Sequence, residues 1–303
     1  MPDSEKKILF LVGCPRSGTT LVQEILNRHP AIALAPELFY IRHFVETTPT
    51  LQDSESRLRL GKKIIAQDWF DRLEIEKEEF LHWMETRGTT HALIYRELLR
   101  RYGAQKDATW IGDKTPNNVL YIPRLLTYFP DAVFLHILRD PRAVVRSWKT
   151  VPWTTGTIWG DAKIWRKYIR AWDRFRSYTE GRGLTIRYED VIGNPETTVQ
   201  SICQFLNLPY DEALLNPSGR ESSFVPEAEP WKKNAAAGID PDLRDRWQQE
   251  LTSTEIAGIE WICGSDMVKW GYPLRTKWWH RIRHLSVSVW FPYVTFLRRK
   301  LSK

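Results

Sequence analysis

The stretch KKILFLVGCPRSGTTLVQEILNRHP, residues 6–30, decides the fold that the sequence predicts. An apolar run over residues 8–13 is followed by a turn of Gly, Arg, Ser and Thr and then by a helical pattern. This order is typical of a phosphate-binding loop between a buried strand and a helix. Gly13 and Gly18 have the G-x-x-x-x-G spacing of such a loop, but Thr19 follows where a nucleotide triphosphatase has lysine. The stretch therefore predicts an anion site whose positive charge comes from another residue.

Further apolar runs predict more buried strands, and helical patterns separate them. Strands that alternate with helices favour a parallel sheet covered on both faces. We therefore expect an α/β fold, a P-loop-like three-layer arrangement with a central parallel sheet flanked by helices. The expected strands are residues 8–13, 109–113, 132–140 and 183–190, with a weaker one over residues 31–37.

Composition limits the class of protein. The chain has 303 residues, of which 42% are hydrophobic, enough for a sizeable core. Its formal net charge of +7 favours anionic partners, although a solubilising surface explains that charge equally well. The 3 cysteines are widely spaced and indicate neither a disulfide framework nor a zinc cluster. With a short polar N-terminus and no apolar run of about 18 residues, we expect a cytoplasmic protein, soluble or peripheral at a membrane.

The chemistry of the loop suits an anion. Successive backbone N–H groups at a helix N-terminus form a nest of partial positive charge. Gly18 lets a ligand approach closely, and Arg16 adds a full positive charge. Ser17, Thr19 and Thr20 offer hydroxyl donors. The alternative is an ordinary strand-to-helix turn with threonine caps.

A second motif, FLHILRDPRAVVRSW, covers residues 134–148. Arg139 ends the expected strand, at the edge where open parallel sheets bind ligands. Ser147 lies two turns into the following helix. A guanidinium and a hydroxyl together suit a phosphate monoester. Arg142 and Arg146, spaced i,i+4, are expected to lie on a solvated helix face.

Together with IRYEDVIGNPETTVQSICQFLNL, residues 186–208, these motifs resemble the sulfotransferase family that uses 3′-phosphoadenosine 5′-phosphosulfate (PAPS). The chain most resembles the branch with tyrosylprotein and bacterial sulfotransferases. The order, spacing and strand context of the motifs agree over about residues 7–208. The resemblance implies in-line transfer of a sulfuryl group from PAPS to an acceptor hydroxyl, less readily an amine.

The resemblance also implies roles for particular residues. Residues 16–20 would hold the 5′-phosphosulfate, and Arg139 with Ser147 would bind the 3′-phosphate. Tyr188 matches a family tyrosine near the nucleotide. Tyrosylprotein members place another nucleotide-contacting arginine four residues after the serine, where this chain has Val151, which argues against a peptide-tyrosine acceptor.

Family members also have a basic residue in a late loop that closes over the cofactor. Lys232 and Lys233, in the segment PWKKN, are the candidates in this chain.

Glu37 directly follows the second expected strand, where the resemblance implies a catalytic glutamate. A carboxylate there could accept the acceptor's proton, whereas the alternative is a charge at the N-terminus of the following helical pattern. Lys114 matches a family lysine that stabilises charge on the leaving bridging oxygen; the alternative is a surface lysine in a turn. Asp113 would orient that lysine or cap the next helix. His29 and His136 are expected to be structural.

The expected co-substrate is PAPS, and we expect no metal site. A sulfuryl group carries less charge than a terminal phosphoryl group, so it needs a metal ion less. The alternatives are a P-loop small-molecule kinase, against which Thr19 argues, and a non-catalytic anion- or nucleotide-binding protein. Retention of Glu37 and Lys114 beside an intact loop argues against the second.

We expect one sulfotransferase domain over residues 1–273, with a helical insertion at about 38–107 and a cofactor and acceptor loop at about 208–241. A basic amphipathic tail follows over residues 274–303. Its apolar segment is too short to span a bilayer, which favours an interfacial anchor or a helix docked on the domain. A small molecule, a glycan or a lipid-linked molecule would be the acceptor, with no nucleic acid partner. The sequence specifies neither the acceptor nor the oligomeric state.

Overall fold

The computed structural model describes residues 6–48, 50–216 and 239–276. These residues fall into two compact units. The first unit holds the described residues up to Arg139 and from Ala171 to Pro241. The second holds those from Asp140 to Arg170 and from Asp242 onward. The domain range 1–273 stays a prediction.

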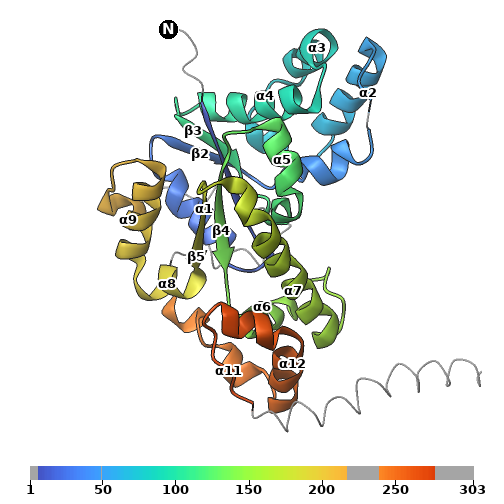
Figure 1. Ribbon diagram of the computed structural model, residues 1–303. Helices are drawn as coiled ribbons and strands as arrows, with labels where there is room; N and C mark the ends of the chain where they lie inside the picture. The colour runs from blue at the N-terminus through green and yellow to red at the C-terminus, as the bar shows by residue number, and fades with distance from the viewer. Residues whose placement is uncertain (1–5, 49, 217–238, 277–303) are drawn as a thin grey trace, which may run out of the picture. The chain divides into compact units, whose positions relative to one another are not determined.

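The first unit is built on a parallel sheet of five strands in the described part of the chain, in the order β2-β3-β1-β4-β5 (Figure 1). Each neighbouring pair is parallel. All five expected strands, the weaker one included, are confirmed, and so is the predicted α/β, P-loop-like fold. The strands are β1 (Lys7–Gly13), β2 (Ile32–Ala35), β3 (Trp110–Asp113), β4 (Val133–Leu138) and β5 (Gly183–Arg187).

Helices pack on this sheet and fill the region between β2 and β3, where the sequence predicts an insertion. The first unit holds α1 (Thr19–Asn27), α2 (Ser54–Ile65), α3 (Lys77–Arg87), α4 (His91–Ala104), α5 (Ile122–Tyr128), α8 (Tyr188–Gly193) and α9 (Pro195–Leu206). Its shorter elements are the π-helix η1 (Ile41–Val45) and the 3₁₀ helices η2 (Asp71–Leu73), η3 (Pro116–Tyr121), η4 (Arg176–Thr179) and η5 (Glu212–Leu215).

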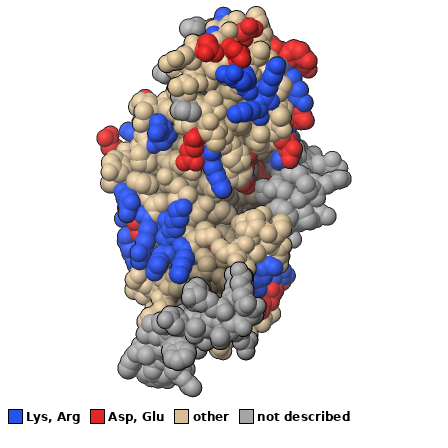
Figure 2. All heavy atoms as spheres, turned by 90° about the vertical axis from the view of Figure 1, so that its right-hand side faces the viewer, with Lys and Arg blue, Asp and Glu red and all other residues tan. Residues whose placement is uncertain are grey.

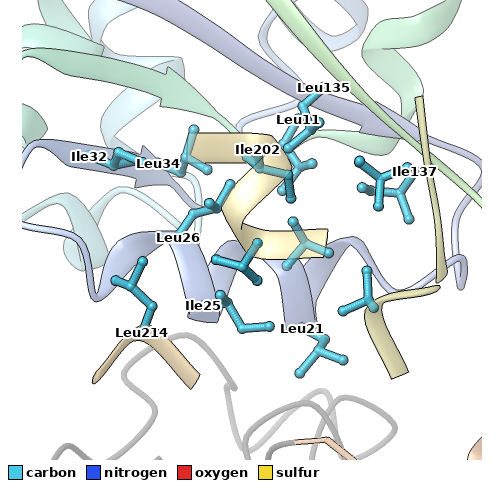
Figure 3. Packing of buried hydrophobic residues seen from close by; sticks show 14 of the residues in the cluster. Leu11, Leu21, Ile25, Leu26, Ile32, Leu34, Leu135, Ile137, Ile202 and Leu214 are labelled. Carbon is cyan, nitrogen blue, oxygen red and sulfur yellow. The ribbon is translucent and has the colours of Figure 1, made fainter. Parts of the chain in front are cut away.

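Alternating side chains of β1 fill two cores because both faces of the sheet are covered. Leu9 and Leu11 face one side, where they join side chains of α1, α8 and α9 in a buried cluster (Figure 3). Phe10 faces the other side, where its ring lies 5.9 Å from that of Tyr95 and 5.8 Å from that of Phe129. The apolar run that opens the sequence therefore belongs to a central strand, which explains why it is apolar without a break.

The second unit is helical. It contains α6 (Pro141–Trp148), α11 (Trp247–Glu250) and α12 (Ser253–Lys269), with the 3₁₀ helix η7 (Pro241–Leu243) at its boundary. The helix α7 (Ile158–Phe175) begins in this unit and ends in the first. A capping box at Thr252 and Glu255 starts α12, where each side chain accepts from the backbone of the other.

Arg142 corrects the sequence-based expectation of a solvated helix face. It is only 2% exposed, and its guanidinium donates to Asp140 Oδ2 at 2.6 Å and to Glu260 Oε1 at 2.8 Å. A buried charge is tolerated when carboxylates pair with it, and two do so here. Arg146, one turn further on, is partly exposed and pairs with Glu250.

Basic side chains gather along the surface of α7 (Figure 2). The spacing of the exposed ones, at i, i+4, i+7 and i+11, puts them on one face of this helix. They are Lys163, Lys167, Arg170 and Arg174.

Arg142→Met should destabilise the chain strongly, because it leaves the buried carboxylates of Asp140 and Glu260 without their cation. Breaking a buried ion pair from one side costs about 3–5 kcal/mol. The matched control is Arg146→Met on the same helix, which should cost about 1 kcal/mol or less, as partly exposed pairs do. Urea denaturation measures both, and equal losses would contradict the buried network.

Candidate active site

The loop after β1 has the geometry of an anion nest. Arg16 and Gly18 have φ angles of 71° and 93°, in the left-handed region. The N–H of Ser17 donates to the carbonyl of Cys14 at 3.1 Å, which closes the turn. Gly18 is the N-cap of α1 and has no side chain, so the cap leaves the first N–H groups of the helix to another acceptor.

The hydroxyl of Ser17 fits an absent ligand. Ser17 is fully buried, and its Oγ has no hydrogen-bond partner among the described residues. Buried hydroxyls are normally hydrogen-bonded, and leaving one unpaired costs about 1–3 kcal/mol. An anionic oxygen held in the nest would accept from this hydroxyl. The loop therefore fits an anionic group.

Tyr188 and Arg139 lie against the loop. A Cβ atom at Gly18 would come within 2.2 Å of Cδ2 of Tyr188, so only glycine lets this ring lie so close. The guanidinium of Arg139 lies 4.0 Å from the centroid of the same ring and donates to the carbonyl of Arg16 at 3.1 Å. Burial raises the pKa of Tyr188, while the nearby charge of Arg139 opposes that shift. The structure thus holds a cation beside a loop that lacks lysine.

Glu37 and Lys114 are brought together by the sheet. The parallel register of β2 and β3 sets Ala35 opposite Asp113, so the residues just after both strands meet at one edge. Lys114 Nζ donates to Glu37 Oε1 at 2.6 Å and to Thr20 Oγ1 at 3.4 Å. A single buried ammonium therefore contacts both the carboxylate and the loop.

The surroundings of Lys114 and Glu37 exclude the alternative interpretations, a surface lysine in a turn and a charge at a helix N-terminus. The side chain of Lys114 is 2% exposed, so it is not a surface lysine in a turn. Glu37, whose side chain is 20% exposed, precedes the π-helix η1 in an irregular segment, so it is not the first residue of a helix. The carboxylate is accessible, whereas the ammonium is enclosed.

Asp113 forms the base of this arrangement. It is fully buried and accepts from Tyr95 Oη, from Thr115 Oγ1 at 2.6 Å and from Asn118 Nδ2 at 3.4 Å. Burial raises the pKa of Asp113 to about 7, against the opposing effect of hydrogen bonds from Thr115 and Tyr95 and of the charge on Lys114. The sequence patterns do not single out Tyr95, Thr115 or Asn118. Thr115 and Asn118 do belong to the segment DKTPNN, which contains Lys114.

The remaining candidates for the nucleotide site are Ser147, Lys232 and Lys233. Ser147 belongs to the second unit, where it is buried on α6 and its carbonyl accepts from Thr150 Oγ1 at 2.9 Å. Lys232 and Lys233 lie outside the described residues. Their assignment to the nucleotide stays a prediction.

The two histidines have structural environments, as expected. His136 is fully buried, and its ring stacks on that of Trp172 at 4.6 Å. Burial lowers its pKa to about 3, so the ring stays neutral at ordinary pH. His29 Nδ1 accepts from the N–H of Ala31 and thus fixes the turn after α1.

Comparison with known proteins agrees with this geometry. The model of the sulfotransferase family matches residues 9–212, which include every described candidate residue. The chain therefore belongs to the sulfotransferase family.

Two relatives that are distant in sequence are both named as sulfotransferases. The protein-tyrosine sulfotransferase of Drosophila melanogaster is 25% identical over 222 residues, covering 70% of this chain and 40% of the relative. The omega-hydroxy-beta-dihydromenaquinone-9 sulfotransferase Stf3 of Mycobacterium bovis is 28% identical over 253 residues, covering 68% and 64%. The chain thus spans less than two thirds of each of these relatives.

The same fold is found in a solved sulfotransferase domain from the curacin biosynthetic pathway. Its TM-score is 0.63 at 21% identity, and the match covers 88% of this chain and 98% of that domain. This likeness supports the fold.

The raised pKa of Asp113 gives a pH dependence of stability. The folded protein keeps a proton on this group at pH values where the unfolded chain has released it. The contribution of Asp113 to the free energy of unfolding should therefore fall as the pH rises from about 4 to about 7, and then level off. Asp113→Asn removes this titration. The difference in unfolding free energy, wild type minus variant, should therefore fall as the pH rises from about 4 to about 7. Urea denaturation at a series of pH values tests this, and a difference that is constant or rises with pH would contradict it.

Proposed function

We propose that this chain transfers a sulfuryl group from PAPS to an acceptor hydroxyl and leaves adenosine 3′,5′-bisphosphate. The observation that supports this most is the position of Lys114, which contacts both Glu37 and Thr20 of the loop. Membership of the sulfotransferase family supports the reaction class. A less favoured acceptor group is an amine.

The proposed donor site uses both anionic ends of PAPS. Residues 16–20 would bind the 5′-phosphosulfate through backbone N–H groups, the buried Ser17 hydroxyl and the charge of Arg16. Arg139 and Ser147 would bind the 3′-phosphate, and Tyr188, which packs against Gly18, would lie near the nucleotide. Lys232 and Lys233 are proposed to close over it.

In the proposed step, the acceptor oxygen attacks sulfur while the bond from sulfur to the bridging oxygen breaks in line. Glu37 takes the proton of the acceptor hydroxyl, which its partial exposure allows. The electron pair of the broken bond stays on the bridging oxygen of the bisphosphate product. Lys114, held at the loop, offsets the charge that develops there. The reaction as proposed needs no metal ion.

The rival functions fit the site less well. A P-loop kinase places a lysine in the loop to contact the transferred phosphoryl group, where this chain has Thr19. A non-catalytic anion-binding protein has no need of a carboxylate held 2.6 Å from the buried ammonium that contacts Thr20 of the loop. Both rivals also leave the family match unexplained.

We propose a small-molecule, glycan or lipid-linked hydroxyl as the acceptor. Val151 is buried after α6, where a tyrosylprotein enzyme has its arginine, and this departure disfavours a peptide tyrosine. The mycobacterial relative is named for omega-hydroxy-beta-dihydromenaquinone-9, which is consistent with a lipid-like acceptor.

We further propose that the protein is cytoplasmic and contacts a membrane through its tail, residues 274–303. Within the described residues, none of the helices has the length and apolar character needed to cross a bilayer. The exposed Lys and Arg side chains on one face of α7 would be attracted to an anionic lipid surface. The tail adds Trp and further basic residues.

Glu37→Gln should lower kcat by a factor of about 10²–10⁴, the usual contribution of a positioned general base. Its affinity for adenosine 3′,5′-bisphosphate should stay near that of the wild type, because the loop is unchanged. Sulfate transfer from labelled PAPS to acceptors in an extract, identified by mass spectrometry, gives the rate. The matched control is Glu46→Gln, at an exposed position after η1, which should leave kcat unchanged. Wild-type turnover in Glu37→Gln would remove Glu37 as the base.

Vesicle binding tests the membrane contact. The chain of 303 residues should sediment with phosphatidylglycerol vesicles and not with phosphatidylcholine vesicles. Deletion of residues 277–303, which make up most of the tail, should abolish this. Lys163→Gln with Lys167→Gln should weaken binding about tenfold or more, at about 1 kcal/mol per basic residue near an anionic surface. The control that removes the same charge is Lys62→Gln with Lys63→Gln on α2. An equal loss of vesicle binding in this control would contradict a specific role for the basic face of α7.

A further inference from the structure

Thr115 holds the segment that follows Glu37. This threonine is buried directly after Lys114, and its Oγ1 accepts from two backbone N–H groups. The N–H of Leu38 lies 3.1 Å away and that of Phe39 lies 3.3 Å away. One hydroxyl therefore fixes both residues that come after the carboxylate.

The backbone at this point needs such support. Residues 36–39 form an irregular segment between β2 and α-helical Tyr40, outside the hydrogen-bonding ladder of the sheet. Phe39 has φ 47°, a left-handed conformation that costs a residue with a side chain of order 1–3 kcal/mol. Strained residues persist where the surrounding contacts determine them, and the hydroxyl of Thr115 supplies two such contacts.

Asp113 orients that hydroxyl. The O–H of Thr115 donates a hydrogen bond to Asp113 Oδ1 at 2.6 Å, so the lone pairs of its oxygen are left for the two N–H groups. Asp113 is itself held by Tyr95 and Asn118 on its other oxygen. The chain of hydrogen bonds runs from α4 and η3 through β3 to the turn that contains Glu37.

The same short segment positions both members of the ion pair. Lys114 lies between Asp113 and Thr115 in sequence, and its backbone N–H donates to the carbonyl of Ala35 at 3.1 Å. Lys114 is thus fixed as part of this segment, and Glu37 is fixed through the hydroxyl of Thr115. A shift of that hydroxyl would move the carboxylate relative to the ammonium.

We propose that Thr115 and Asp113 are positioning residues for proton transfer: the hydroxyl of Thr115, oriented by Asp113, fixes the turn that holds Glu37 against Lys114. This inference rests on the proposed function of Glu37 as the base. Neither residue belongs to the loop assigned to the donor. Their loss should therefore change turnover and leave donor affinity unchanged.

Thr115→Val and Thr115→Ser form a matched pair of variants. Valine keeps the shape and removes the hydroxyl, whereas serine keeps the hydroxyl. Thr115→Val should lower kcat by about 10²-fold, the loss that misplacement of a reacting group by about 1 Å can cause. Thr115→Ser should stay within about threefold of the wild type, and both should bind adenosine 3′,5′-bisphosphate as the wild type does. Wild-type kcat in the valine variant, or equal losses in both variants, would overturn the proposal.

Amide hydrogen exchange tests the positioning without using activity. The amides of Leu38 and Phe39 should exchange at least about tenfold faster in Thr115→Val than in the wild type, and at near wild-type rates in Thr115→Ser. Unchanged exchange in the valine variant would overturn the role of Thr115 whatever the kinetics show. If the wild type transfers no sulfuryl group to any acceptor, the proposed function and the catalytic part of this inference fail. Faster exchange in that case would still establish that Thr115 fixes the segment.

A second variant covers the case in which Thr115→Val does not fold. Tyr95→Phe keeps the ring and removes one hydrogen bond to Asp113. It should lower kcat by a smaller factor, about threefold to tenfold, with unchanged affinity for the bisphosphate. An unchanged kcat in this variant would overturn the part assigned to Asp113.

Discussion

The candidate site depends on the parallel pairing of β2 with β3. Their register sets Ala35 opposite Asp113, so that Glu37 and Lys114 emerge at the same edge of the sheet. The register between β1 and β3 brings the loop to that edge as well, which lets Lys114 reach Thr20. Three segments far apart in sequence therefore meet because their strands run in one direction.

Positive charge reaches the loop from neighbouring strands. Lys114 follows β3 and donates to a loop hydroxyl, and Arg139 follows β4 and donates to a loop carbonyl. In a nucleotide triphosphatase the loop supplies its own lysine and works with a metal ion. Here the ammonium is buried, and a buried cation requires a partner, which Glu37 provides. The pairing that makes burial of Lys114 tolerable also places a carboxylate beside the anion site.

Sequence patterns predicted the sheet well because its strands are buried on both faces and read as unbroken apolar runs. The family resemblance implies a catalytic role for Glu37 and for Lys114 separately, whereas the ion pair between them is apparent only in the structure. The hydrogen bonds from the turn after Glu37 to Thr115 have no signal in the sequence, because the N–H of Leu38 and the hydroxyl that accepts from it are 77 positions apart. Arg142 was predicted wrongly because i,i+4 spacing describes one helix, whereas its partner Glu260 lies 118 residues away.

Nucleotide-dependent thermal unfolding tests the central claim, that the loop without lysine binds a nucleotide with a 3′-phosphate. Adenosine 3′,5′-bisphosphate should raise the Tm of the intact chain in a concentration-dependent way, because a ligand that binds only the folded state stabilises it by about 2.7 kcal/mol at a hundredfold excess over Kd. ATP with Mg²⁺ should raise the Tm little. Stabilisation by ATP with Mg²⁺ but not by the bisphosphate would contradict the account.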